Sequence, residues 1–270
     1  MIDSTLIMVR SVELGLVELD LIDLAFSIGL IGIAIIISLW QKLKLEGQFL
    51  MSAGRTLLQL LVVGYILDII FVLDNWLAVL GILTVMISIA SVVAKNRIDK
   101  SLPNLLPYVW LSIFASVAVT LSYVIFVIVQ PPNWYSPQYL IPLAGMLMGN
   151  AMTGASLAGD RLVSSIKQNY LSIETNLSLG ATPKQAIFNY QKGAIFVGLM
   201  PILNNMLVVG LVSFPGMFTG QVLAGATPLN AASYQIMILF AIVLTNLIVT
   251  VLVTEGVYRR FFNSSYQLTL

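Results

Sequence analysis

The sequence predicts an all-α membrane protein with about seven transmembrane helices, an N-terminus outside the cell and a C-terminus in the cytoplasm. Of the 270 residues, 59% are hydrophobic and only 9% are charged, and the mean hydropathy is +0.96. Soluble domains carry about 25% charged residues. The apolar residues form continuous runs and do not alternate with polar ones, which favours membrane helices over the strands of a membrane barrel.

Seven apolar runs are long enough to cross a bilayer, which takes roughly 20 helical residues. They lie at about Leu19–Trp40, Thr56–Leu73, Trp76–Ala94, Tyr108–Val129, Leu140–Gly159, Ala194–Ser213 and Ser233–Thr254. The uncharged stretch between the last two runs is rich in glycine, and irregular backbone near a membrane needs cover from protein or water. No repeat or separate soluble domain is evident, so residues 1–270 are predicted to form one transmembrane domain.

The lysines and arginines predict the orientation of the chain. If the seven runs alternate across the membrane, every basic residue except Arg10 falls on one side. These residues are Lys42, Lys44, Arg55, Lys95, Arg97, Lys100, Arg161, Lys167, Lys184, Lys192, Arg259 and Arg260. Loops rich in lysine and arginine stay in the cytoplasm. The first, third and fifth connections and the C-terminal tail are therefore predicted to be cytoplasmic.

The fifth connection, at about residues 160–193, contains a regular apolar pattern. The apolar positions recur at helical spacing at Leu162, Ile166, Tyr170, Ile173 and Leu177. This spacing predicts an amphipathic helix that continues to Leu179. Gly180 follows directly, and a glycine just past a helix end adopts the left-handed conformation without a steric cost.

A second helix is predicted to begin two residues after Gly180. Thr182 is a helix-capping residue type, and Pro183 suits the first helical position. Lys184 follows, and Gln185 stands where its side chain can complete a capping box with Thr182. The sequence thus predicts a helix, a sharp turn and a second helix on the cytoplasmic side.

Polar residues interrupt the fifth and sixth apolar runs. Asn150, Thr153 and Ser156 lie in the fifth run, and the pair Asn204 and Asn205 lies in the sixth. Buried amides in hydrocarbon cost free energy unless they bond to a partner or to water. These residues could line a polar pathway through the membrane. They could equally form hydrogen bonds between helices, worth about 0.6 kcal/mol each on average.

Methionines gather in the same two runs or just beyond them, at Met146, Met148, Met152, Met200, Met206 and Met217. Thioethers are soft ligands that suit copper(I), although flexible packing is the more common use of methionine. We include Met146, Met152 and Met206 with the candidate pathway. The chain has no histidine and no cysteine. A site for iron or another hard cation would therefore use carboxylates, carbonyls and amides, and the sequence identifies no metal ligands.

The predicted cytoplasmic turn also carries a family resemblance. Glu174, Gly180 six residues later and the run Ala-Thr-Pro-Lys-Gln-Ala resemble the coupling-helix motif of bacterial ABC importer permeases, with Thr175 and Asn176 where two alanines are usual. The resemblance implies that Glu174, Gly180, Thr182, Pro183, Lys184 and Gln185 contact a separate ATPase. The chain itself has no GxxxxGK[ST] phosphate loop. We therefore expect no enzymatic site and no cofactor on this chain, with ATP and Mg²⁺ on the partner.

A broader resemblance covers the chain from the second apolar run onward. The stretches Ile141–Leu162 and Asn204–Gly225, with the turn between them, are similar to the FetB family of membrane subunits of bacterial ABC-type exporters assigned to iron efflux. That family is related to plant aluminium-tolerance half-transporters. The resemblance implies a homodimeric permease for iron or another metal ion in the inner (plasma) membrane, driven by an ATPase that docks on residues 174–187.

Other functions fit the same sequence. The plant relatives of the family suggest a nucleotide sugar or another small solute as cargo. A stand-alone carrier or channel is expected to hold an ionisable residue near the bilayer midplane, and the nearest candidate is Asp68, towards the outer end of the second run. A membrane scaffold without transport is a third possibility.

Overall fold

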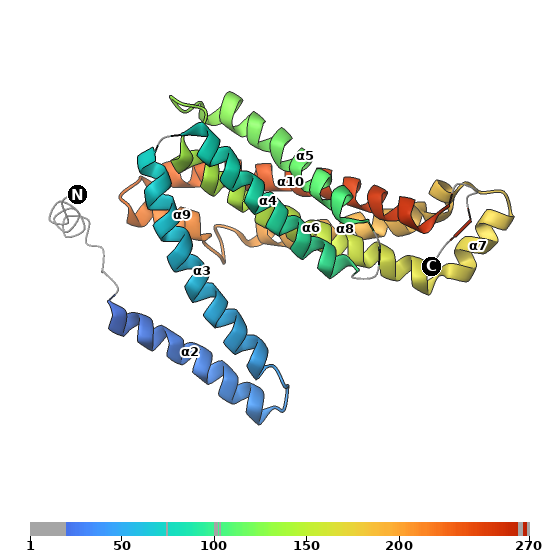
Figure 1. Cartoon of the computed structure of the whole chain (residues 1–270), viewed down its shortest axis with the longest axis horizontal. Coiled ribbons are helices and arrows are strands. Elements are labelled where there is room, and N and C mark those ends of the chain that lie inside the picture. Colours follow the sequence, from blue (N-terminus) through green and yellow to red (C-terminus); the bar gives the residue numbers. More distant parts are fainter. Residues whose placement is uncertain (1–19, 74, 100–101, 103, 264–266, 269–270) are drawn as a thin grey trace. The chain divides into compact units, whose positions relative to one another are not determined.

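The structure, a computed structural model, describes residues 20–73, 75–99, 102, 104–263 and 267–268. The helices are α2 (Leu21–Trp40), α3 (Glu46–Leu73), α4 (Trp76–Ile98), α5 (Leu106–Tyr123), the π-helix η1 (Val124–Val129), α6 (Pro137–Gln168), α7 (Tyr170–Ser178), α8 (Pro183–Val208), α9 (Gly216–Leu223) and α10 (Pro228–Phe261) (Figure 1). Within these residues, seven helical segments are long and apolar enough to cross a membrane. The all-α fold with seven spans is confirmed, and the orientation stays a prediction.

The chain divides into two compact units. The first contains α2, α3 and residues 220–227. Its two helices are joined by a short turn in which Lys42 and Lys44 adopt positive φ angles. Ser38 stabilises this turn, because its hydroxyl donates to Glu46 Oε1 at 2.9 Å and accepts from the Leu45 N–H at 3.3 Å. Most other side chains of α2 and α3 are exposed and apolar, as expected of helices that face lipid.

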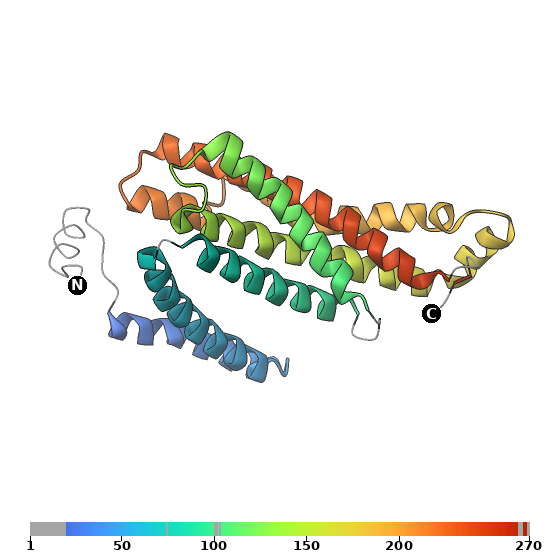
Figure 2. The same ribbon diagram turned by 45° about the horizontal axis from the view of Figure 1, so that its top comes forward.

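The second unit is a helix bundle built around α6 and α10. Helix α6 packs against α4, α5, α8 and α10, and α10 also packs against α5 and α8. Figures 1 and 2 show these helices side by side in both views. Small residues let α6 occupy the centre, since Ala144, Ala151, Ala155 and Ala158 are completely buried. Close approach of helices through small residues is the usual way in which membrane bundles pack.

Several predicted boundaries need correction. The amphipathic helix predicted to run unbroken to Leu179 is interrupted at Asn169, where α6 ends and α7 begins. Helix α8 starts at Pro183, so the second helix after the turn is continuous with the sixth span. That span ends at Val208 instead of Ser213, because the chain becomes extended at Val209 and turns at Gly210, whose φ is +81°. Arg55 lies inside α3 and not in a loop.

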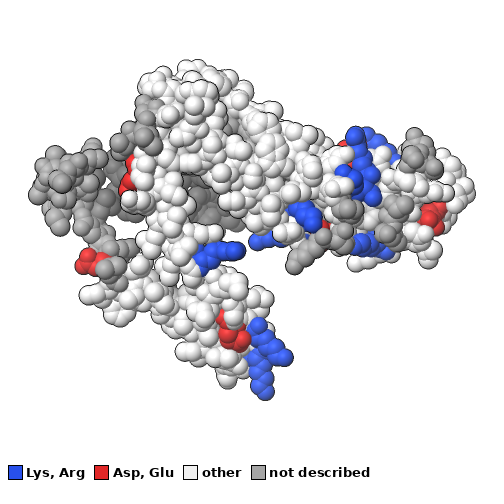
Figure 3. All heavy atoms as spheres, in the orientation of Figure 1, with Lys and Arg blue, Asp and Glu red and all other residues white. Residues whose placement is uncertain are grey.

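Charge is concentrated at one end of the bundle. The first part of α8 carries Lys184 and Lys192, the end of α10 carries Arg259 and Arg260, and the last part of α6 carries Arg161 and Lys167. Figure 3 shows these basic side chains gathered towards the end that carries α7, with an uncharged surface over most of the bundle. Lys167 forms an ion pair with Asp99 at 2.7 Å, which ties α6 to the end of α4. We call this the basic end, and it is the predicted cytoplasmic side.

Candidate functional site

The turn at the basic end has a well-defined backbone structure. Helix α7 ends with the Gly180 N–H donating to the Leu177 carbonyl and the Ala181 N–H donating to the Asn176 carbonyl, each at 3.0 Å. These two bonds are the Schellman motif, which requires a left-handed residue just past the helix. Gly180 is that residue, with φ of +91°. The helix end predicted at this glycine is confirmed.

The start of α8 is capped as its sequence predicts. The Gln185 N–H donates to Thr182 Oγ1 at 3.3 Å, and the Thr182 N–H donates to Gln185 Oε1 at 2.9 Å. Pro183, which has no N–H to satisfy, occupies the first turn. The end of α7 and the start of α8 are therefore both capped by hydrogen bonds within residues 176–185.

Loss of the cap should be measurable at the first turn of α8. In Thr182→Ala the Gln185 N–H loses its acceptor, so we expect the turn to lose about 1 kcal/mol of stability. That loss corresponds to roughly fivefold faster hydrogen exchange at the amides of the first turn. Thr182→Ser keeps the hydroxyl and should exchange as the wild type does. Equal exchange in the alanine and serine variants would show that the cap contributes nothing.

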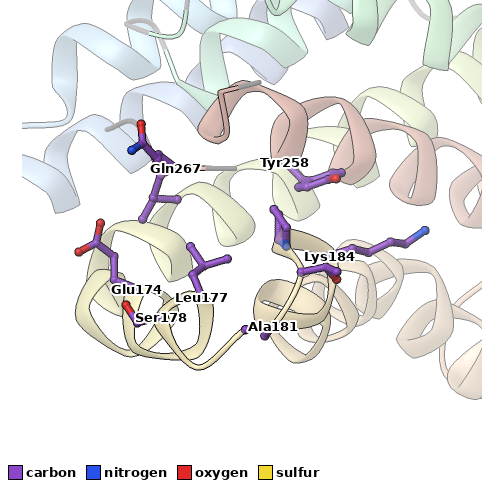
Figure 4. Close-up of a pocket in the computed structure, with 11 residues that line it drawn as sticks. Glu174, Leu177, Ser178, Ala181, Lys184, Tyr258 and Gln267 are labelled. Atoms are coloured by element: carbon purple, nitrogen blue, oxygen red, sulfur yellow. The ribbon is translucent and has the colours of Figure 1, made fainter. Parts of the chain in front are cut away.

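A pocket of about 730 Å³ lies beside this turn. Five of the six predicted coupling residues line it, namely Glu174, Gly180, Thr182, Pro183 and Lys184, while Gln185 is held just outside by its capping bonds. Leu177, Ser178 and Ala181 complete this side of the pocket. Figure 4 shows Glu174 and Lys184 on opposite sides. The structure thus brings the predicted residues together around one open surface, and their coupling role stays a prediction.

The Glu174 side chain interacts with Tyr170, a neighbour on its own helix. A hydrogen bond from the Tyr170 hydroxyl to the Glu174 carboxylate raises the pKa of Tyr170, with smaller contributions from desolvation and from the negative charge of Glu174. The two residues are four apart, so their side chains lie on the same face of α7. Glu174 thus interacts with Tyr170 at the edge of the pocket.

The opposite wall of the pocket comes from the C-terminal part of the chain, which the sequence did not point to. Tyr258 of α10 lies there with Gln267 and Leu268. The chain turns back after α10, since the Asn263 N–H donates to the Gln267 carbonyl at 3.1 Å and the Gln267 N–H donates to Asn263 Oδ1 at 2.9 Å. No local signal at residues 258–268 marks them as neighbours of the turn, because their proximity is set by tertiary packing.

The candidate pathway residues of α6 bond mainly to their own helix. Asn150 Nδ2 donates to the Met146 carbonyl at 2.8 Å, Thr153 Oγ1 to the Gly149 carbonyl at 3.1 Å and Ser156 Oγ to the Met152 carbonyl at 2.6 Å. Ser156 is buried, and Met146, Asn150, Met152 and Thr153 are half-buried. The hydroxyl protons of Thr153 and Ser156 are therefore used within α6 and do not connect it to another helix.

The candidate residues of α8 are more open. Asn204 and Asn205 are exposed, and Met206 is half-buried. Asn205 is seven residues beyond Gly198, on the same side of the helix, and Gly198 and Ile202 on this side are buried. The polar end of α8 is thus uncovered by the rest of the bundle, while its middle is packed. Whether these residues line a pathway stays a prediction.

The described residues contain no group of three or more acidic side chains that could hold a metal ion. The candidate pathway offers amide and hydroxyl oxygens on Asn150, Thr153, Ser156, Asn204 and Asn205, and thioether sulfur on its methionines. These are neutral ligands. A cation in contact with them would be held without charge compensation, and so weakly.

Seven apolar spans, of which those in α6 and α8 are connected at the basic end by α7 and a capped turn beside an open pocket, define a multi-pass membrane protein. The model of the Uncharacterised protein family (UPF0014) matches residues 21–262. The chain belongs to this family.

Relatives from several organisms support this assignment. The chain is 56% identical to a UPF0014 membrane protein of Synechocystis sp., over 95% of this chain and 99% of the relative. It is 36% identical to the "Probable iron export permease protein FetB" of Escherichia coli, over 92% and 94%. It is also 36% identical to "Protein ALUMINUM SENSITIVE 3" of Arabidopsis thaliana, over 87% and 85%. The predicted resemblance is confirmed. No solved structure matches the chain significantly.

Proposed function

We propose that this chain is the membrane subunit of an ABC transporter that exports iron or another metal ion. A separate cytoplasmic ATPase, which carries ATP and Mg²⁺, docks on residues 174–187. Two copies of the chain form the pathway in the inner (plasma) membrane. The observation that carries the proposal is the capped turn with its adjoining pocket, where five predicted coupling residues meet at the basic end.

Exposed apolar side chains beside the pocket support a protein partner there. Leu171 is 77% exposed and Leu179 is 80% exposed, and both lie between the spans of α6 and α8. Apolar surface that faces lipid needs no further explanation, but α7 lies outside the candidate spans. Exposed apolar patches in water mark sites of interaction with proteins or membranes. The polar and charged residues at the pocket edge favour a protein surface over lipid tails.

Pairing with a second copy of the chain would cover the exposed polar end of α8. Asn204 and Asn205 are exposed within a membrane-spanning helix, where polar groups in contact with lipid are costly. Polar residues in such segments usually face other protein or a water-filled path. Pairing of two copies across this face would place four asparagine amides, two from each copy, along the space between them.

The cargo is proposed from the family. A relative that is 36% identical over most of the chain is named as a probable iron export permease, and the neutral oxygen ligands of α6 and α8 suit a path that must release its cargo. ATPase stimulation of the reconstituted complex by metal ions, chelates and nucleotide sugars would identify the substrate. Transport by the same liposomes without the ATPase would contradict the proposal and favour a stand-alone carrier.

The docking surface has a direct test. Leu179→Asp places a charge in the exposed apolar patch, so we expect at least a tenfold loss of ATPase co-purification with the membrane subunit. The fold should be unaffected, because the side chain is exposed. Ser172→Asp adds the same charge to an exposed position of α7 outside residues 174–187, removes no apolar surface and serves as the matched control. Normal co-purification of Leu179→Asp would contradict docking at this turn.

A further inference from the structure

Three helices of the bundle, α6, α8 and α10, pack closely at Gly198. A Cβ atom at Gly198 of α8 would lie 2.7 Å from Thr250 Cγ2 of α10, 2.8 Å from the Gly154 carbonyl oxygen of α6 and 2.9 Å from Ala158 Cβ. Only glycine fits at such a distance. Gly154 and Gly198 are both buried, so the three helices close the bundle at this level.

A polar side chain is buried at the same crossing. Asn246 of α10 is 3% exposed, and its Oδ1 atom is buried without a hydrogen-bond partner. The amide group lies directly over Gly154, because both Cγ and Oδ1 are 3.4 Å from the position that a Cβ of Gly154 would occupy. Even a Cβ atom at Gly154 would be in van der Waals contact with the Asn246 amide, so the amide packs closely on α6.

The oxygen of Asn246 is unusual among the polar groups around it. Thr250 Oγ1 donates to the backbone carbonyl of Asn246 at 2.7 Å, and Thr254 Oγ1 donates to the backbone carbonyl of Thr250 at 2.8 Å. Gln191 Nε2 donates to Thr254 Oγ1 at 3.3 Å. These three side-chain donors, which lie between the crossing and the basic end, therefore already have acceptors. A buried acceptor without a donor lowers stability, and the Asn246 oxygen therefore keeps an unused capacity to bind a donor or a cation.

The position of the crossing relates it to the candidate pathway. Asn246 and Gly154 lie near the middle of α10 and α6. Along α8, in the direction away from the basic end, the face that is buried at Gly198 is exposed at Asn205. The crossing therefore lies below the open polar end of α8, beyond the buried Ile202.

We propose that the crossing of Gly154, Gly198 and Asn246 is a constriction of the transport path and that Asn246 contacts the cargo there. When α8 moves away from α6, Oδ1 becomes available to an electropositive group, either a hard cation or the O–H or N–H of a polar solute. An uncharged amide oxygen binds such a group weakly, which permits release. The inference rests on the proposed function and assigns a cargo contact to a helix that the sequence had not placed in the pathway.

The test uses two leucine substitutions in the full-length chain, reconstituted with its ATPase. Asn246→Leu keeps a similar volume and removes the unpaired oxygen, so we expect equal or higher resistance to thermal unfolding. Transport of Fe²⁺ or UDP-glucose, whichever the wild-type complex moves, should fall at least tenfold. Basal ATPase activity and co-purification should not change, because Asn246 lies outside the docking surface. This separates the result from a failure of docking, which the variants of residues 174–187 report.

Gln235→Leu is the matched control. Gln235 is also on α10, is 8% exposed and has an unpartnered Oε1, but it lies about 16 Å further along the helix from Asn246. It should leave transport intact. Asn246→Asp distinguishes the two kinds of cargo, because an added carboxylate should preserve Fe²⁺ transport but not UDP-glucose transport. Unchanged transport in Asn246→Leu would overturn the proposal. A lower unfolding temperature of this variant would also overturn it, because the amide would then stabilise the fold.

Discussion

Replacement of Gly198 by alanine is expected to destabilise the bundle by about 1–3 kcal/mol, the range found for overpacked cores. The added methyl group would lie within 3 Å of atoms from both α6 and α10, and one of these is a backbone oxygen that cannot rotate away. Helix α8 would have to shift. Titration of the purified protein with a denaturing detergent, followed by loss of helical circular dichroism, measures the change.

Gly193→Ala on the same helix is the control, because nothing lies within 4 Å of a Cβ at that position. Alanine favours a helix over glycine by up to about 1 kcal/mol. The two substitutions make the same chemical change and should shift stability in opposite directions. If both stabilise the protein equally, the close approach at Gly198 does not exist.

Gly180→Val should cause a loss of ATPase co-purification of about tenfold or more. No atom lies within 4 Å of a Cβ at Gly180, so the expected effect comes from the backbone alone. A β-branched residue at φ of +91° is strained, because its Cβ crowds the neighbouring carbonyl oxygen. The chain would leave the left-handed conformation, and the two bonds of the Schellman motif would break.

Gly180→Asn tests this explanation. Asparagine tolerates the left-handed conformation much better than other residues with a side chain. It should therefore restore most of the ATPase binding, although it is about as large as valine. Stability of the spans should be similar in both variants, because Gly180 lies between them. Wild-type ATPase binding by Gly180→Val would refute the coupling role of the turn.

Local signals in the sequence were sufficient for the spans and the turn. Continuous apolar runs identify membrane helices, and Gly180 and Thr182 act through bonds to residues within four positions. The break at Asn169 was missed for a related reason. Leu162, Ile166 and Ile173 are all completely buried, so their spacing correctly reports one buried face. That face continues across the break, and no proline or glycine marks it.

Contacts between distant segments could not be predicted in this way. Asn246 and Gly154 meet because α6 and α10 pack side by side, and Tyr258 and Leu268 meet the turn because the chain folds back after α10. One usable signal was present in α10, where Asn246, Thr250, Thr254 and Tyr258 recur every four residues. This spacing places polar groups along one side of an apolar helix. It does not show which helix they face.

The continuity of α8 from Pro183 to Val208 has a mechanical consequence. At 1.5 Å per residue, the helix extends about 22 Å from Pro183 to Gly198 and about 15 Å from Gly198 to Val208. A displacement of the docking turn would therefore be carried along one rod, past Gly198, to the asparagine-bearing end, so that α8 could leave α6 at the crossing. Pro201, just past Gly198, sets how much of that displacement is absorbed by bending.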